Sequence, residues 1–167
     1  RMLQYARKNV EGSEFLVADA RDFSLEHKFA AAYSVFESLN HIPDVDGLRR
    51  AFECVYRHLE PRASFLFDLN GEEAFSLYWN ETSAIVEADV VCLLRSEYNE
   101  GTRVGRCEVT LFEQDEQWRR SDFTLQQTCH PIADVHNALE SAGFEDVTLY
   151  NAQDAGMSEA TGHDRTF

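Results

Sequence analysis

The sequence predicts an α/β fold with a doubly wound, mostly parallel sheet and an antiparallel β meander inserted in its second half. Two nearly continuous apolar runs, 29–36 and 63–70, are typical of strands that helices cover on both faces. A helical pattern separates them, and strand, helix and strand at this spacing favour a right-handed parallel crossover. The helical period then disappears between 83 and 129, which indicates the meander.

The N-terminal part supplies a helix and a short strand. Apolar residues recur at helical spacing over 1–10, and an apolar strand over 14–19 ends at Asp19. A polar connection over 21–28 leads to the next strand. Because the chain opens inside a helix without a capping residue, we expect it to be truncated at its N-terminus, and we leave truncation at the C-terminus open.

A strongly amphipathic helix is predicted over 45–59. Its apolar residues recur every three or four positions, and Asp44 or Asp46 supplies the N-cap. Pro61 is expected to end this helix, because proline cannot continue the helical hydrogen-bond pattern.

The meander, 83–129, consists of three apolar segments separated by turns. In its middle segment apolar and polar side chains alternate, so we expect one covered face and one wet face. The alternating positions are Cys107, Val109 and Leu111 against Arg106, Glu108 and Thr110. The sequence leaves open whether this insertion serves as a lid over a substrate or as a dimer surface.

The C-terminal part returns to helix and strand. A helix over 132–142 closes at Gly143, which suits the left-handed conformation of a helix C-cap. A strand is predicted over 144–150, and Thr166-Phe167 reads as the first two residues of a further strand.

Composition and charge restrict the function. A chain of 167 residues with 44% hydrophobic residues predicts one domain, 1–167, with its own core. The 30 acidic and 15 basic side chains give a net charge of −15, which repels phosphate backbones and anionic lipid, so we expect neither a nucleic-acid nor a membrane partner. Four widely spaced cysteines without a C-x-x-C pair predict reduced thiols in a cytoplasmic protein and no metal site.

Polar residues follow three of the predicted strands at the point where each strand ends. The segments read ADARDF (18–23), FESLNHI (36–42) and DLNGEE (68–73). In open α/β sheets, ligands bind beyond the carboxyl ends of parallel strands, because loops and helix N-termini converge there. The same residue types form ordinary turns, but three such ends in one sheet favour a binding crevice.

The order of the motifs ML--AR, DARDF, SVFESLNHI, LEP and FDLN resembles that of class I S-adenosylmethionine-dependent methyltransferases. It is most similar to the small-molecule branch that includes glycine N-methyltransferases and sugar N,N-dimethyltransferases. The likeness covers almost the whole chain, including the meander and the closing ALESAGFEDV, but the family's G-x-G-x-G turn is absent and its Pro-Gly-Gly is Pro-Arg-Ala here. The resemblance implies a Rossmann-like fold and an enzyme that transfers a methyl group to a small molecule, most often an amine.

The resemblance also implies S-adenosyl-L-methionine as the cofactor. Asp19 would accept a hydrogen bond from the adenine amino group, and the backbone at Ala20 would lie against the ring. The other residues implied to bind the cofactor are Met2 and Leu3 at the adenine, and Ser34, Val35 and Phe36 at the methionine part.

The acceptor side of the site is implied in the same way. Asn40 and His41 match the loop that closes over the methyl group, and His41 is the candidate base because imidazole titrates near neutrality. A hydrogen bond within the loop is the other interpretation of His41. Asn70, Tyr78 and Trp79 are further candidates for substrate contact, although the two aromatic residues suit the core equally well. A rival function is that of a non-catalytic, methyltransferase-like module that associates through the meander, with a homodimer left open.

Overall fold

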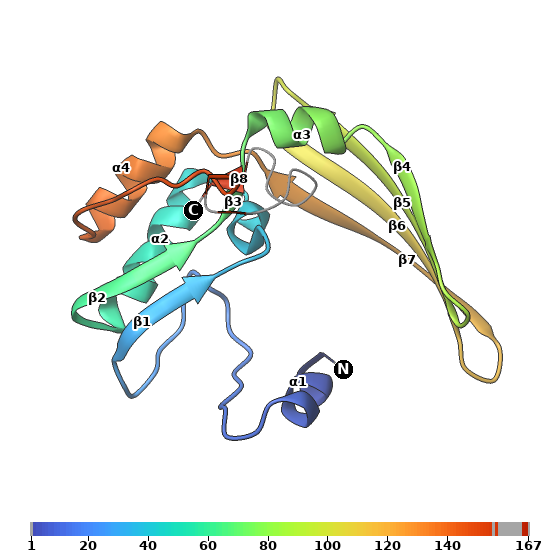
Figure 1. Ribbon diagram of the computed structural model, residues 1–167, viewed down its shortest axis with the longest axis horizontal. Helices are drawn as coiled ribbons and strands as arrows, with labels where there is room; N and C mark the ends of the chain where they lie inside the picture. The colour runs from blue at the N-terminus through green and yellow to red at the C-terminus, as the bar shows by residue number, and fades with distance from the viewer. Residues whose placement is uncertain (1, 155, 157–164, 167) are drawn as a thin grey trace.

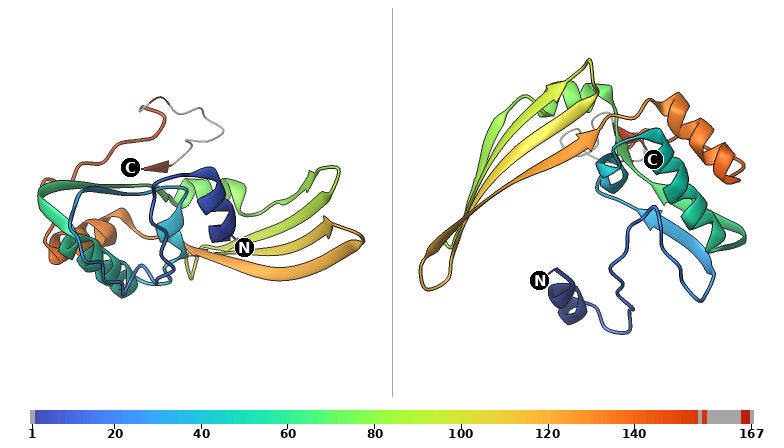
Figure 2. Two further views of the ribbon diagram at one scale, coloured as in Figure 1. Left: turned by 90° about the horizontal axis from the view of Figure 1, so that it is seen from below. Right: turned by 180° about the vertical axis from the view of Figure 1, so that it is seen from behind.

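The computed structural model describes residues 2–154, 156 and 165–166 of the chain (Figure 1). Its two main parts are a parallel strand pair packed on helices and a long antiparallel sheet that projects away from that pair (Figures 1 and 2). Helices α2 (Val45–Arg57) and α4 (Ile132–Ala142) lie side by side on one face of the parallel pair. The fold is therefore α/β, as the sequence predicts. The predicted cover of helices on both faces of the strands is not found among the described residues, where Tyr33 and Leu66 of the parallel pair are exposed.

The parallel pair consists of β1 (Phe29–Ser34) and β2 (Leu59–Phe67), and α2 connects them. In the ladder Ala31 lies opposite Ser64 and Ser34 lies opposite Phe67. The predicted strand, helix and parallel strand are thus confirmed.

The rest of the predicted parallel sheet is confirmed only in part. β3 (Leu69–Asn70) and β8 (Arg165–Thr166) pair antiparallel, and β1 with β2 is the one parallel pairing among the described strands. Thr166 lies in a strand as predicted, whereas Phe167 lies outside the described residues.

Helix α2 begins where the sequence predicts and ends earlier. The Asp44 carboxylate accepts a hydrogen bond from the Gly47 N–H at 2.6 Å, which identifies Asp44 as the N-cap. The helix ends at Arg57, and Pro61 lies inside β2, so the prediction that Pro61 ends the helix is wrong. The reason is tertiary: Leu59 already pairs with Phe29 in the parallel ladder.

The main core lies between α2, α4 and β2. Leu48, Ala51 and Phe52 of α2 are buried, and the Phe52 ring lies 5.4 Å from the Phe67 ring. Gly143 ends α4 with φ 104°, a left-handed conformation that confirms the predicted C-cap.

Two apolar segments predicted as strands are not strands. In 14–19, Leu16 and Val17 are exposed, and Asp19 makes an isolated bridge to Asp22. A strand is stabilised by a ladder with a neighbour, and the second edge of β1 has no partner among the described residues. In 144–150 the apolar side chains of Phe144 and Val147 pack on the main core without a ladder.

Helix α1 (Met2–Asn9) forms as predicted but lies apart from the other elements. An extended segment leads from it to the turn before β1 (Figures 1 and 2). The views therefore place α1 away from the carboxyl ends of β1 and β2.

The meander forms a four-stranded sheet in which each strand pairs with the next. Its first predicted segment divides into two strands at the turn 87–89. The strands are β4 (Thr82–Val86), β5 (Val90–Asn99), β6 (Val104–Gln114) and β7 (Trp118–Thr128).

The predicted alternation of faces along β6 holds with one exception. Cys107 and Val109 are buried, while Arg106 and Glu108 are exposed. Thr110 is expected on the wet face but is buried, and its hydroxyl donates a hydrogen bond to the Asp122 carboxylate.

The base of the meander packs on α3 (Glu72–Tyr78), where Phe75, Tyr98 and Cys129 form a second small core. Three of the four cysteines, Cys54, Cys107 and Cys129, are buried. Within the described part of the chain, no helix is both long enough and apolar enough to cross a bilayer.

Candidate functional site

The carboxyl ends of β1 and β2 meet, as expected for neighbouring parallel strands. The Asp68 N–H donates a hydrogen bond to the Ser34 carbonyl at 3.1 Å. In return, the buried Asp68 carboxylate accepts a hydrogen bond from the Glu37 N–H at 3.2 Å. Two of the three polar segments predicted to share a crevice are therefore in direct contact.

An unusual turn follows β1. Phe36 and Glu37 have φ values of 61° and 50°, so two consecutive residues with a Cβ adopt the left-handed conformation. This conformation costs free energy unless the surroundings hold it, and residues in it concentrate at binding and catalytic sites. The turn leaves the Phe36 side chain 77% exposed at the strand end.

A cluster of charged groups holds this turn. Arg165 forms an ion pair with Glu37, and its Nε lies 3.5 Å from the Asp68 carboxylate. Burial raises the pKa of Asp68 and lowers that of Arg165. Sequence reasoning missed Arg165, because nothing in the sequence brings residue 165 next to residue 37. Asp68 belongs to the predicted polar segment 68–73, but sequence reasoning assigned it no role of its own.

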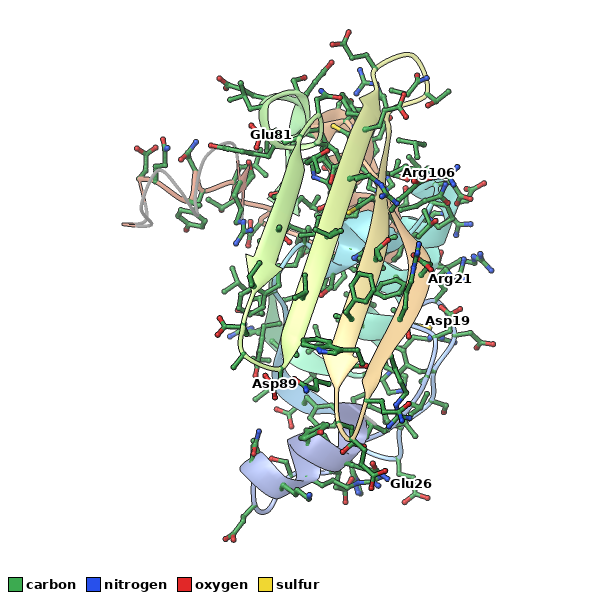
Figure 3. The ribbon with its side chains drawn as sticks, turned by 90° about the vertical axis from the view of Figure 1, so that its right-hand side faces the viewer. Asp19, Arg21, Glu26, Glu81, Asp89 and Arg106 are labelled. Carbon is green, nitrogen blue, oxygen red and sulfur yellow. The ribbon has the colours of Figure 1, made fainter. Side chains whose placement is uncertain are left out.

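The third polar segment contains Asp19 and Arg21, which lie side by side in Figure 3. The Arg21 guanidinium donates to both carboxylate oxygens, from Nε to Oδ1 at 2.9 Å and from Nη2 to Oδ2 at 2.7 Å. These hydrogen bonds to Arg21 hold the pKa of Asp19 far below its usual value.

This segment reaches the start of α2. Gly47 has close neighbours from this segment and from the loop after β1. The point where a Cβ on Gly47 would stand is 3.5 Å from the Arg21 Cδ atom and 2.7 Å from the Cγ2 atom of Ile42 in that loop. The segments that carry Asp19 and Ile42 therefore both reach the N-terminus of α2. The polar segment 68–73 contacts the loop after β1, so the three segments are neighbours, although the one that carries Asp19 does not follow a strand.

Asn40 is the most completely bonded of the predicted site residues. Its side chain is 0% exposed, and its Nδ2 donates to the carbonyls of Thr128 and Asn70, at 2.9 and 3.3 Å. Its Oδ1 accepts a hydrogen bond from the Asn70 N–H at 3.0 Å. The Asn40 side chain thus connects the loop after β1 to the backbone of Asn70 in β3 and of Thr128 in β7. Asn40 and Asn70, both predicted to contact substrate, are therefore in contact with each other.

His41 lies next to Asn40 in the short helix η1 (Ser38–His41) and is exposed. Its Nδ1 lies 2.8 Å from the Gln126 carbonyl, which can only accept, so Nδ1 carries a proton. In the neutral ring Nε2 is then an acceptor, and the Gln127 amide lies 3.3 Å from it. The predicted loop hydrogen bond is present, and Nε2 is the atom left for proton transfer.

The remaining predicted residues lie in different surroundings. Trp79 packs on Phe75, with ring centroids 5.2 Å apart, and covers Gly105, so its ring belongs to the second core. Tyr78 is about half exposed. Leu3 lies on α1 together with Met2, away from the strand ends.

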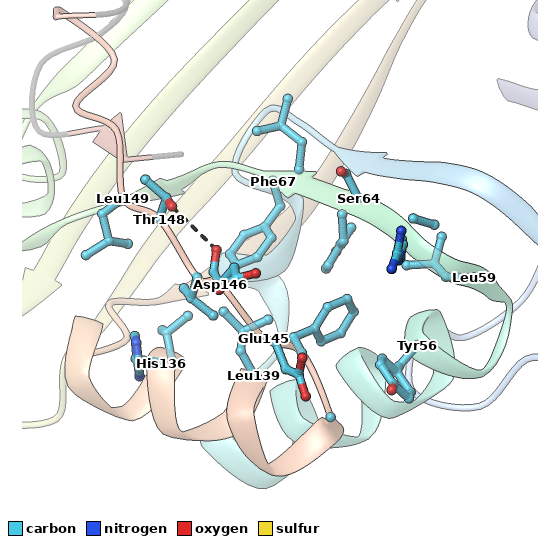
Figure 4. Close-up of a pocket in the computed structure, with 18 of the residues that line it drawn as sticks. Tyr56, Leu59, Ser64, Phe67, His136, Leu139, Glu145, Asp146, Thr148 and Leu149 are labelled. Atoms are coloured by element: carbon cyan, nitrogen blue, oxygen red, sulfur yellow. Dashed lines mark hydrogen bonds between the residues drawn. The ribbon is translucent and has the colours of Figure 1, made fainter.

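A large cavity of about 980 Å³ lies elsewhere, between β2 and the segment 144–150 (Figure 4). Apolar side chains such as Phe67, Leu139 and Leu149 line it. None of Asp19, Phe36 and His41 lines this cavity, so it is separate from the convergent strand ends.

The residues at the strand ends fit an adenosyl sulfonium. Asp19 offers a carboxylate acceptor on an exposed turn, which suits the amino group of an adenine. Phe36 offers an exposed aromatic face, which suits a cation. Phe36 lies just after β1, and Asp19 lies in the turn whose Arg21 reaches the start of α2.

The fold is that of S-adenosylmethionine-dependent methyltransferases. A methyltransferase of this class from Clostridium acetobutylicum superposes with a TM-score of 0.79 at 17% identity, over 99% of this chain and 66% of that one. The predicted resemblance is confirmed at the level of the fold. The chain matches no protein-family model.

The particular proteins that it resembles include a sugar N-methyltransferase, KedS8 of Streptoalloteichus, with a TM-score of 0.71 at 23% identity, over 85% of this chain and 58% of that one. DesVI of Streptomyces venezuelae matches with a TM-score of 0.74 at 23% identity, over 99% of this chain and 68% of that one. CalS10 of Micromonospora echinaspora is an amino pentose methyltransferase with S-adenosylmethionine bound. It matches with a TM-score of 0.69 at 22% identity, over 99% of this chain and 68% of that one. In sequence, 60 residues are 37% identical to a dTDP-3-amino-3,4,6-trideoxy-α-D-glucopyranose N,N-dimethyltransferase of Streptomyces venezuelae. That match covers 36% of this chain and 25% of the relative, so the chain spans a quarter of the curated relative and about two thirds of the solved structures.

Proposed function

We propose that the protein transfers a methyl group from S-adenosyl-L-methionine to the amine of a small molecule. The observation that carries this proposal is that three polar segments, 18–23, 36–42 and 68–73, lie together in a chain that superposes on a methyltransferase over 99% of its length. Relatives described as sugar N-methyltransferases and as an amino pentose methyltransferase favour an amino sugar as the acceptor.

Binding rests on groups at the three strand ends. Asp19 would accept the hydrogen bond of the adenine amino group, with the Ala20 backbone against the ring, and the backbone of Ser34 and Val35 would hold the methionine part. The exposed face of Phe36 favours the sulfonium by about 0.5–2 kcal/mol. Met2 and Leu3 remain predicted adenine contacts that would require α1 to approach the site.

The reaction is an in-line displacement that needs alignment more than covalent help. Bound S-adenosylmethionine would supply the methyl group: the lone pair of the acceptor nitrogen would form the new N–C bond, and the electron pair of the broken C–S bond would stay on sulfur. Correct alignment of such reactants contributes up to about 7–11 kcal/mol. The left-handed turn at Phe36–Glu37, fixed by Asp68 and Arg165, is the rigid element that provides it.

His41 takes the proton that the acceptor nitrogen loses. Its Nδ1–H is held by the Gln126 carbonyl, so Nε2 is the basic atom. The acceptor amine must displace the Gln127 amide from Nε2 to reach it. Asn40 and Asn70 support this loop, and Tyr78 forms part of the substrate wall.

The test is cofactor binding. Asp19→Ala is expected to weaken the affinity of the full-length enzyme for S-adenosylhomocysteine about tenfold or more, because the amino group loses its acceptor. Asp122→Ala is the matched control, since Asp122 pairs with Arg120 in the meander in the same way. Unchanged binding of the Asp19 variant in calorimetry would remove the adenine assignment.

The rival function is a non-catalytic module that associates through the meander. Apolar side chains on the sheet favour it, namely Ile85, Val86, Trp118, Phe123 and Leu125, each at least 42% exposed. The hydrogen bonds of Asn40 and His41 to β7 fix the base of the sheet, which favours a dimer surface over a moving lid. A melting temperature that S-adenosylhomocysteine does not raise, together with a dimer in light scattering, would support the module.

A further inference from the structure

The Asp19 carboxylate is held in one orientation by its own turn. Three hydrogen bonds from Arg21 reach it: the backbone N–H and Nε donate to Oδ1, both at 2.9 Å, and Nη2 donates to Oδ2 at 2.7 Å. The Asp22 N–H closes the turn on the Asp19 carbonyl at 3.0 Å. Neither side chain can rotate without breaking this set of bonds.

The arrangement leaves one acceptor position open. A carboxylate has about four lone-pair sites, two on each oxygen. Oδ1 accepts two hydrogen bonds from Arg21 and is filled, whereas Oδ2 accepts one. The Asp19 side chain remains 49% exposed, so the open site on Oδ2 is accessible to a ligand.

Arg21 lies beside the start of α2. Its Cδ packs at 3.5 Å from the Cβ position of Gly47, and the Gly47 N–H is bonded to the capping Asp44. Arg21 therefore holds Asp19 from a place beside the start of α2.

We infer that Arg21 is the positioning residue for Asp19, and that the pair selects a purine with an amino group over one with a carbonyl at the same position. This inference rests on the proposed function, because it assumes that Asp19 faces the base of the cofactor. An oriented anion accepts from an N–H group and repels a carbonyl oxygen, which has no proton to donate.

The pairing also keeps Asp19 in the form that this selection needs. The hydrogen bonds to Arg21 lower the pKa of Asp19, so the carboxylate stays ionised in mildly acidic solution. A protonated Asp19 could donate to a carbonyl, and the discrimination between the two purines would be lost.

The experiment compares two ligands by calorimetry on the full-length enzyme: S-adenosylhomocysteine and its deaminated analogue, S-inosylhomocysteine. The wild type is expected to prefer the adenine form by about tenfold or more, since one charge-assisted hydrogen bond is replaced by a repulsive contact. Arg21→Gln is expected to lose most of this preference, and Arg21→Lys, which keeps the charge but not the fork, part of it. Arg120→Gln is the control, because Arg120 makes the same forked contact with Asp122 on the meander.

A double variant separates positioning from general damage to the fold. If Arg21 acts through Asp19, Asp19→Asn with Arg21→Gln binds S-adenosylhomocysteine no more weakly than Asp19→Asn alone. If the loss of binding free energy in the double variant equals the sum of the losses in the two single variants, the inference is overturned. It is also overturned if both Arg21 variants keep the wild-type preference for the adenine form. Wild-type protein that binds neither ligand would overturn the proposed function as well, whereas normal binding by Arg21→Gln beside weak binding by Asp19→Asn would overturn the role of Arg21 alone.

Discussion

Replacing Asn40 with alanine should destabilise the fold strongly, although Asn40 lies in the short helix η1. The side chain is 0% exposed and forms three hydrogen bonds with the backbone of Asn70 and Thr128. Alanine would leave two carbonyls and one N–H without these partners, and each such buried group costs about 1–3 kcal/mol. Allowing for relaxation, we expect the free energy of unfolding to fall by about 3 kcal/mol.

Urea unfolding followed by circular dichroism measures this loss. With a slope of about 2 kcal/mol per molar urea, the midpoint should fall by about 1.5 M. The matched control is Asn99→Ala: Asn99 is exposed and accepts one hydrogen bond, from the Thr102 N–H at 2.9 Å, so at most about 1 kcal/mol is expected. Equal midpoints for the two variants would refute the cross-linking role of Asn40.

Three further predictions concern stability. Burial lowers the pKa of His130 from its usual 6.5, so the unfolded chain binds a proton more readily than the folded chain does. The free energy of unfolding should therefore fall as the pH drops below about 6.5. Urea midpoints at pH 7.5 and 5.5 should differ less in His130→Gln than in the wild type. Gly105→Ala would place a Cβ 2.5 Å from the Trp79 ring and should lower the free energy of unfolding by about 1–3 kcal/mol. The near-UV circular dichroism of the tryptophan should weaken as well, and an unchanged urea midpoint would contradict the packing of Trp79 on Gly105. Asp44→Ala removes the N-cap of α2 and should cost about 1 kcal/mol in the same assay, whereas Asp44→Ser should recover most of it.

The parts of the fold that sequence predicts well are those specified by local pattern. Spacing and residue type predict the apolar face of α2 with its N-cap at Asp44, the C-cap of α4 at Gly143, and the alternation of buried and exposed side chains along β6. Where a neighbour decides, the predictions fail. The apolar run 14–19 has strand propensity but no ladder, and β2 begins before Pro61 because Leu59 pairs with Phe29.

The candidate site divides in the same way. The sequence predicts that polar strand ends converge, and contacts between Glu37 and Asp68 agree with this. It does not predict the left-handed turn at Phe36, because neither residue of the turn is glycine or asparagine. Arg165 contacts Glu37 across most of the chain, and no local pattern encodes such a pair.

The attachment of the loop after β1 to the end of β7 affects how the chain folds. The hydrogen bonds from Asn40, His41 and His130 span sequence separations of 85 to 88 residues. Closing so long a loop has an entropic cost that is repaid only after the meander has formed, so these contacts belong to the late steps of folding. Weakening them should accelerate unfolding and leave the refolding rate almost unchanged, which makes this junction the place where the kinetic lifetime of the native state is set.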